Sequence, residues 1–85
     1  MNEKAKLKKA YQQMVDWNTY RLEQNRQSLD KLVHLLSELD RDLKGGEIYE
    51  KDVVDLDALK IIYETGIRSF ESQVDRYNNL ISDLD

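Results

Sequence analysis

His34 is the only imidazole in the sequence, and it has an acidic residue one helical turn to either side. Asp30, His34 and Glu38 follow one another at four-residue intervals, so in a helix they share one face and could loosely hold a metal ion. The repeated Glu-x-x-His pattern of di-metal helical bundles is missing. We therefore interpret this face as a solvated helix surface and predict neither a metal site nor a cofactor.

Other catalytic arrangements are missing from the sequence as well. The chain has no cysteine, which excludes a thiol nucleophile, a cysteine zinc site and a disulfide framework. A Ser/His/Asp arrangement has only the outward-facing His34 to draw on. Gly45 and Gly46 lack the Gly-x-x-x-x-Gly-Lys spacing of a phosphate-binding loop. We predict a protein without catalytic residues and without enzymatic activity.

Length and composition limit the elements that can position a functional surface. The 85 residues are enough for a single domain, and a chain with 35% charged residues and no proline is typical of a mostly helical protein. No apolar run approaches the roughly 18 residues of a membrane span. The net charge of −4 disfavours generic nucleic-acid binding. We expect a cytoplasmic protein, or one that is exported together with a partner.

Glycine divides the chain into two long helices. Gly45 and Gly46 are the only strong helix break, and a glycine just past a helix end can close its last turn. We predict one helical-hairpin domain over residues 1–85, with a helix at about 3–44, a turn at about 45–52 and a helix at about 53–84. Helices of this length are far longer than the globular mean of about 11–12 residues, which favours a coiled coil.

Apolar residues recur at alternating four- and three-residue spacing in both helices, which is the seam of a left-handed coiled coil. In the first helix the seam is Tyr11, Val15, Asn18, Leu22, Asn25, Leu29, Leu32, Leu36, Leu39 and Leu43. In the second it is Leu56, Lys60, Tyr63, Ile67, Phe70, Val74, Tyr77, Ile81 and Leu84. The fold class predicted from this pattern is all-α, with two long antiparallel helices in a coiled-coil hairpin.

The two seams also predict which residues face one another. Folding back at the glycines brings together positions whose residue numbers add up to 95 or 96. This pairing places three polar seam residues opposite large side chains: Asn25 opposite Phe70, Asn18 opposite Tyr77 and Lys60 opposite Leu36. We interpret them as residues that fix the register at some cost in stability.

The two flanks of the seam differ in polarity. One flank carries Thr19, Arg26, Val33 and Asp40 against Asp57, Glu64, Glu71 and Asn78, and we expect it to be solvated, with an ion pair between Arg26 and Glu71. The other flank and the positions beside it form a second apolar stripe. Its predicted partner-binding residues are Met14, Trp17, Ser28, Leu35, Leu59, Ile62, Gly66 and Leu80.

A two-helix hairpin has one inward seam and nothing else to bury a second stripe, and a large exposed apolar patch usually marks an interaction surface. The stripe narrows midway at Ser28 and Gly66, where another backbone can come close. We therefore expect a second helical hairpin, either another copy or a partner's helical domain, to pack on this stripe and complete a four-helix bundle.

A short hairpin with the turn Lys44-Gly45-Gly46-Glu47 and an unsatisfied second face resembles the WXG100 (ESX) group. It is most similar to the small targeting partners encoded beside LXG toxins of type VII secretion. The resemblance implies a hairpin that pairs with itself or with a toxin's N-terminal helical domain. The turn has no Trp-x-Gly, the only tryptophan is Trp17, and Ile81 stands four residues after Tyr77 where an export signal has Asp or Glu. No functional residue of that family is therefore carried over.

These observations favour a non-enzymatic protein–protein interaction module, either adaptor-like or chaperone-like, or a targeting partner of a larger helical protein such as a secreted toxin. Two alternatives stay open. One is a small phage or plasmid regulatory factor that contacts nucleic acid through Lys4, Lys6, Lys8 and Lys9. The other is an immunity protein or antitoxin, which would use the same apolar stripe.

Overall fold

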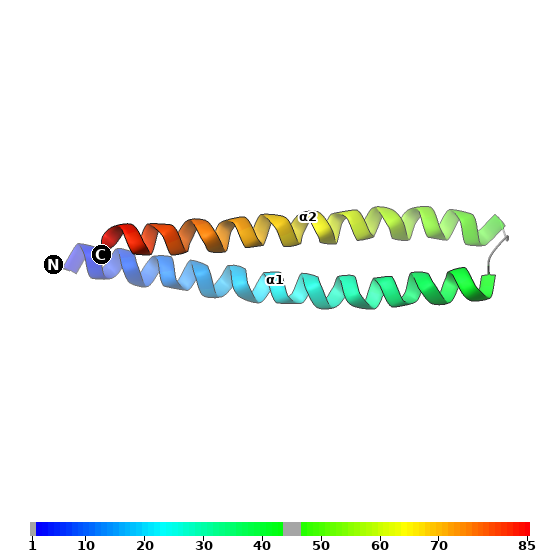
Figure 1. Cartoon of the computed structure of the whole chain (residues 1–85), viewed down its shortest axis with the longest axis horizontal. Coiled ribbons are helices and arrows are strands. Elements are labelled where there is room, and N and C mark those ends of the chain that lie inside the picture. The colour runs from blue at the N-terminus through cyan, green and yellow to red at the C-terminus, as the bar shows by residue number, and fades with distance from the viewer. Residues whose placement is uncertain (1, 44–46) are drawn as a thin grey trace.

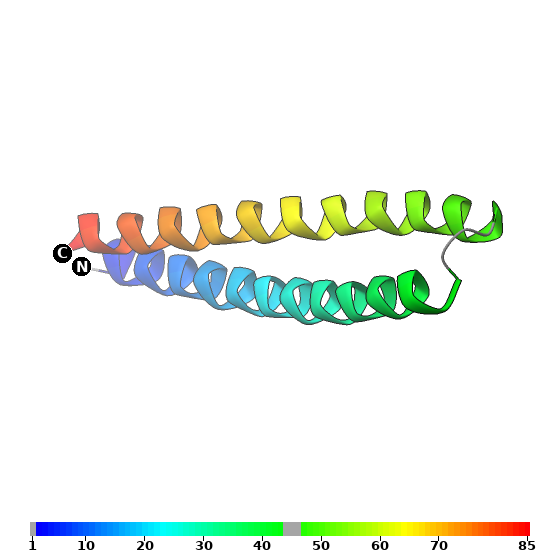
Figure 2. The same ribbon diagram turned by 45° about the vertical axis from the view of Figure 1, so that its right-hand side comes forward.

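The computed structural model of the chain is a hairpin of two long helices (Figure 1). Helix α1 (Asn2–Leu43) has 42 residues and helix α2 (Glu47–Leu84) has 38. The helices run antiparallel and lie side by side, so that the start of α1 and the end of α2 share one end of the rod (Figures 1 and 2). The structure describes residues 2–43 and 47–85, and side chains within 2–42 and 53–85. The predicted all-α hairpin is confirmed.

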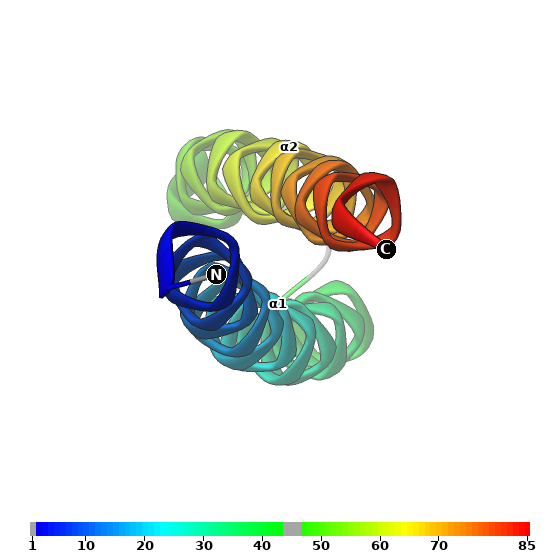
Figure 3. The ribbon, with the colours of Figure 1, turned by 90° about the vertical axis from the view of Figure 1, so that its left-hand side faces the viewer.

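The seam predicted from the heptads holds the two helices together. Every seam residue with a described side chain is buried or half-buried. Among the other described side chains of α1, only that of Ser28 is half-buried, and the rest are exposed. Viewed end-on, the helices wind about one another in a left-handed sense (Figure 3). A strict heptad repeat in a helix of 3.6 residues per turn requires this sense of winding.

The interior of the hairpin is thin. Among the described side chains, only Leu22, Leu32 and Asn18 are less than 9% exposed, and none is fully buried. The rod measures 65 × 14 × 13 Å and has a radius of gyration of 19.0 Å. A compact chain of this length would have a radius of gyration of about 12 Å. Two helices alone therefore leave most of the apolar side chains partly in contact with water.

Helix α2 begins earlier than the sequence analysis predicts. Its first residue is Glu47, whereas we predicted a turn through residue 52 and a helix from about residue 53. The predicted boundary is wrong because residues 47–52 contain neither glycine nor proline, so nothing in their sequence stops a helix. The predicted closure of the last turn of α1 by Gly45 and Gly46 lies outside the described residues.

The register of the two helices differs from the predicted pairing by about one helical turn. The space over Gly66 is filled by the side-chain amide of Asn25, which we predicted opposite Phe70. The Arg21 guanidinium carbon lies 5.6 Å from the centre of the Phe70 ring, which places Phe70 nearer to Arg21 than the predicted pairing does. In both contacts, the residue of α1 meets a residue of α2 that comes earlier in the sequence than the predicted partner.

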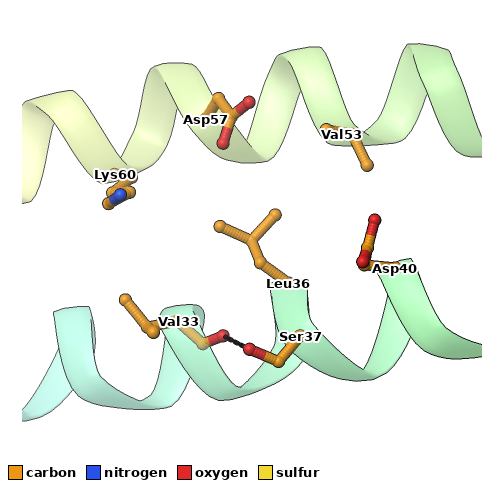
Figure 4. Close-up of a pocket in the computed structure, with 7 residues that line it drawn as sticks. All are labelled: Val33, Leu36, Ser37, Asp40, Val53, Asp57 and Lys60. Atoms are coloured by element: carbon orange, nitrogen blue, oxygen red, sulfur yellow. Dashed lines mark hydrogen bonds between the residues drawn. The ribbon is translucent and has the colours of Figure 1, made fainter.

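Figure 4 shows the same displacement closer to the turn. Lys60 lies across from Val33 rather than from Leu36, and Val53 lies across from Asp40. The physical reason is the short connection, because a turn of fewer residues pairs every α1 residue with an earlier part of α2. A slide of one turn moves each seam residue onto the next seam position of the other helix, so the hydrophobic pattern fits both registers.

Polar contacts along the seam and at its margins are satisfied within the hairpin. The buried Asn18 donates its Nδ2 to the Met14 carbonyl at 2.7 Å. The predicted ion pair between Arg26 and Glu71 forms at 3.0 Å, because both side chains are long enough to span the displaced register. Among the described residues, no buried side-chain nitrogen or oxygen lacks a hydrogen-bond partner.

Candidate interaction surface

One long edge of the hairpin carries the predicted partner-binding residues, and we call it the tryptophan edge. It consists of Leu7, Met14, Trp17, Ser28, Leu35, Leu59, Ile62, Gly66 and Leu80. Leu7, Met14, Ser28 and Leu35 recur at seven-residue multiples, which places them on one flank of the α1 seam. Trp17 and Ile62 occupy the next position outward from the seam on the same side of the rod.

The exposed part of this edge is mainly on α1. Met14, Trp17 and Leu35 are exposed on α1, Trp17 by 54%, and Ile62 is 63% exposed on α2. These are large apolar side chains that a single hairpin leaves in water. Burying apolar surface contributes about 25 cal/mol per Å². A partner that covers these side chains therefore gains binding free energy that the hairpin alone does not obtain.

The α2 half of the edge is more shielded than the sequence suggests. Leu59, Gly66 and Leu80 are half-buried, as is Gln73 in the same seven-residue row. The face that α2 packs against α1 is therefore broader than the face that α1 packs against α2. Leu59 and Leu80 consequently belong partly to the hairpin interior and partly to the edge.

Gly66 has a role inside the hairpin. A Cβ atom added there would collide with the amide of Asn25 and would lie 3.9 Å from the Phe70 ring. We predicted that the backbone of a second chain would come close at Gly66. The side chain of Asn25 from α1 occupies that space instead. Ser28 is half-buried on the same edge, and it stays the small residue that a second chain can approach.

Trp17 contacts two neighbouring side chains of α1. The Arg21 guanidinium carbon lies 5.7 Å from the Trp17 ring centre and 5.6 Å from that of Phe70, so one cation contacts two aromatic rings. The Tyr20 ring lies 6.1 Å from that of Trp17. Sequence reasoning missed the role of Arg21, although its position four residues after Trp17 is a usable signal. An aromatic side chain that is ordered before binding loses less entropy when a partner covers it.

A groove opens on the tryptophan edge nearer the turn. Its volume is about 280 Å³, and it is lined by Ser28, Lys31, Leu32, Leu35, Leu59 and Tyr63. Both helices contribute to it. The small Ser28 side chain is the lining residue nearest to Trp17 along α1.

The opposite edge is less polar than we predicted. Val33 is exposed there, together with Val54 and Ile61 of α2. A second groove of about 320 Å³ lies on this edge between the helices (Figure 4). Its lining residues are Val33, Leu36, Ser37, Asp40, Val53, Asp57 and Lys60. The sequence signal for this exposed apolar pair is the seven-residue interval between Val54 and Ile61.

The residues considered for metal and nucleic-acid binding are all exposed. Asp30, His34 and Glu38 lie on the outer face of α1, and no cluster that could hold a metal ion occurs within the described part of the chain. Lys8 forms an ion pair with Asp85 at 3.3 Å across the open end of the hairpin. The lysine-rich segment therefore contributes to closing that end.

Over the described residues, neither helix contains an apolar stretch that could cross a bilayer. No protein-family model, curated protein or solved structure matches the chain.

Proposed function

We propose that this chain is a non-enzymatic interaction module that docks the helices of a second helical hairpin on its tryptophan edge. The docked helices complete a four-helix bundle around the apolar side chains that the hairpin leaves in water. In the cell, such a module acts as an adaptor or chaperone-like partner, or as a targeting partner of a larger helical protein such as a secreted toxin.

The observation that carries the proposal is the exposure of Trp17 on an edge where Met14, Leu35 and Ile62 are exposed as well. Trp17 is 54% exposed and is braced by Arg21 and Tyr20. Tryptophan, tyrosine and arginine are the residue types that dominate binding energy at protein interfaces. The thin interior supports the same conclusion, because a hairpin in which only three of the described side chains are buried gains substantial stability from a second layer.

A photo-crosslinking amino acid placed at two adjacent positions tests the proposal in the native host. Ile62 and Ile61 are 63% and 62% exposed, and they lie on opposite edges of α2, so they form a matched pair. We expect a crosslinker at Ile62 to give a discrete product that Trp17→Glu abolishes. The same crosslinker at Ile61 is the control, and we expect it to give no such product.

Two outcomes would contradict the proposal. Crosslinking that is equal at both positions would show that the tryptophan edge has no preference over the opposite edge. A product at Ile62 that survives Trp17→Glu would show that the aromatic anchor does not take part. Circular dichroism of the purified Trp17→Glu variant checks that the hairpin still forms, which we expect because Trp17 lies outside the seam.

A further inference from the structure

We infer that the hairpin docked on the tryptophan edge is a second copy of this chain, lying antiparallel to the first. The inference rests on the proposed function, and it names both the partner and its orientation. Three features lead to it: the surface that the hairpin as a whole exposes, the presence of a protrusion and a groove on the tryptophan edge, and the spacing between them.

The elongated hairpin as a whole exposes more surface than a compact chain of its mass, and this excess is as large as the surface that each copy buries in a stable dimer. The chain exposes 6601 Å². A globular monomer of 10.1 kDa exposes about 5,300 Å². Each copy therefore exposes about 1,300 Å² more than a compact chain of its size, and two copies that bury this excess form an interface of about 2,600 Å². That total lies within the range of obligate homodimers, about 2,000–5,000 Å².

The edge also carries both halves of a complementary contact. Met14 and Trp17 protrude from α1 on the side of the open end. The groove lined by Ser28, Leu35 and Leu59 opens closer to the turn. The two features are separated by about 22 Å along the helix at 1.5 Å per residue. A two-fold symmetric interface uses the same patch on both subunits, so a patch that contains a protrusion and a groove can complement itself.

Filling both grooves requires the antiparallel orientation. When the two-fold axis is perpendicular to the rod and passes near Gln24, Trp17 of each copy reaches the level of Lys31, which lines the groove of the other. In a parallel dimer the two grooves lie at the same level, so neither receives an aromatic side chain.

The antiparallel arrangement brings together opposite charges in one place and like charges in another. In the antiparallel arrangement the lysine-rich start of one α1 lies beside Glu38 of the other α1, which is attractive. Asp55 of one α2 then lies beside Asp83 of the other α2, which is repulsive. Filling of the apolar grooves therefore decides the orientation.

The mass of the purified chain tests the identity of the partner. By sedimentation equilibrium we expect about 20 kDa, twice the 10.1 kDa of one chain. The Ile62→Glu variant should weaken the association at least tenfold, whereas Ile61→Glu should leave it within about twofold of the native chain. A monomeric native chain, or an equal effect of the two substitutions, would overturn the inference.

Spin labels on introduced cysteines test the orientation, and the absence of native cysteine makes each label unique. Ala10 and Gln24 are both exposed, near one end and near the middle of α1. In the antiparallel dimer the two Ala10 labels are about 40 Å apart at 1.5 Å per residue, while the two Gln24 labels are close together. Similar short distances for both pairs would indicate a parallel dimer and overturn the inference.

The inference and the proposed function fail in different ways. If the purified chain is monomeric while the crosslinker at Ile62 captures another protein in the host, the edge docks a partner and the second copy is excluded. If the chain is dimeric but neither isoleucine substitution affects the dimer, the edge is not the docking surface and both ideas fail.

Discussion

At the scale of single residues, Asn25 and Gly66 form a close contact between the two helices. Glycine in a helix interior costs about 1 kcal/mol relative to alanine. The Asn25 amide occupies the space that an alanine methyl group at residue 66 would need. Glycine at residue 66 thus lowers the helix propensity of α2, but it leaves room for the polar side chain of Asn25 between the helices.

This contact predicts that Gly66→Ala stabilises the hairpin less than helix propensity alone would suggest. In the native background the new methyl group must displace the Asn25 amide, which offsets part of the gain. In an Asn25→Ala background the obstacle is gone, and we expect a gain of about 1 kcal/mol. Urea unfolding of the four proteins of this double-mutant cycle measures the difference. Equal gains in both backgrounds would show that Asn25 does not limit residue 66.

At the scale of the helices, the seam could be predicted from the sequence, but its register could not. The four- and three-residue spacing identifies the inward face without reference to the other helix, and the burial of Leu22 and Leu32 follows from it. The register depends on where α2 begins. Since a slide of one turn preserves every apolar layer, the short connection selects between two registers that the pattern fits equally well.

The candidate surface was predictable to a similar extent. The exposure of Met14, Trp17 and Leu35 follows from their place on the α1 flank. The shielding of Leu59 and Leu80 does not follow, because it depends on how far α2 rotates towards α1. That rotation is set by side-chain packing across the whole interface, and the spacing of apolar residues does not encode it.

We expect a longer turn to shift the helices into the register predicted from the sequence, in which each α1 residue faces a later residue of α2. Inserting four Gly/Ser residues between Gly45 and Gly46 releases the constraint from the short connection. We expect cysteines at Val33 and Lys60 to be joined by a short bis-maleimide in the native-length hairpin, as their opposition in Figure 4 indicates. With the insertion, cysteines at Val33 and Glu64 should be joined instead. Persistent joining of 33 to 60 in the lengthened chain would show that polar seam residues, and not the turn, fix the register.

The ion pair between Arg26 and Glu71 spans the two helices but contributes little to their association. Its two side chains are 52% and 48% exposed, so water screens the attraction. Exposed pairs of this kind have coupling energies of about 0.2–1 kcal/mol. We expect that range from a double-mutant cycle with Arg26→Gln and Glu71→Gln, read out by urea unfolding, and a smaller value in high salt. A coupling above about 2 kcal/mol would mean that the pair is more shielded in solution than in the hairpin described here.

At the scale of the whole molecule, a rod with so thin an interior depends on what covers its second face. The two helices are held along one seam, and among the side chains that the structure describes there, only Leu22, Leu32 and Asn18 are buried. A partner that binds the folded hairpin and not the unfolded chain adds its binding free energy to the stability of the fold. The stability of this chain should therefore depend on the concentration of its partner.

If the partner is a second copy, the stability of the purified chain rises with its own concentration. Each tenfold increase adds about 1.4 kcal/mol to the apparent free energy of unfolding of the dimer, whereas a monomer shows no change. Trp17 reports the same association, because it is the only tryptophan and passes from 54% exposed to covered. We expect its emission to shift to shorter wavelength over the concentration range in which the unfolding midpoint rises. Ile62→Glu should remove both effects and Ile61→Glu should preserve them, while a midpoint that stays constant over a hundredfold range would mean that the purified chain leaves its tryptophan edge uncovered.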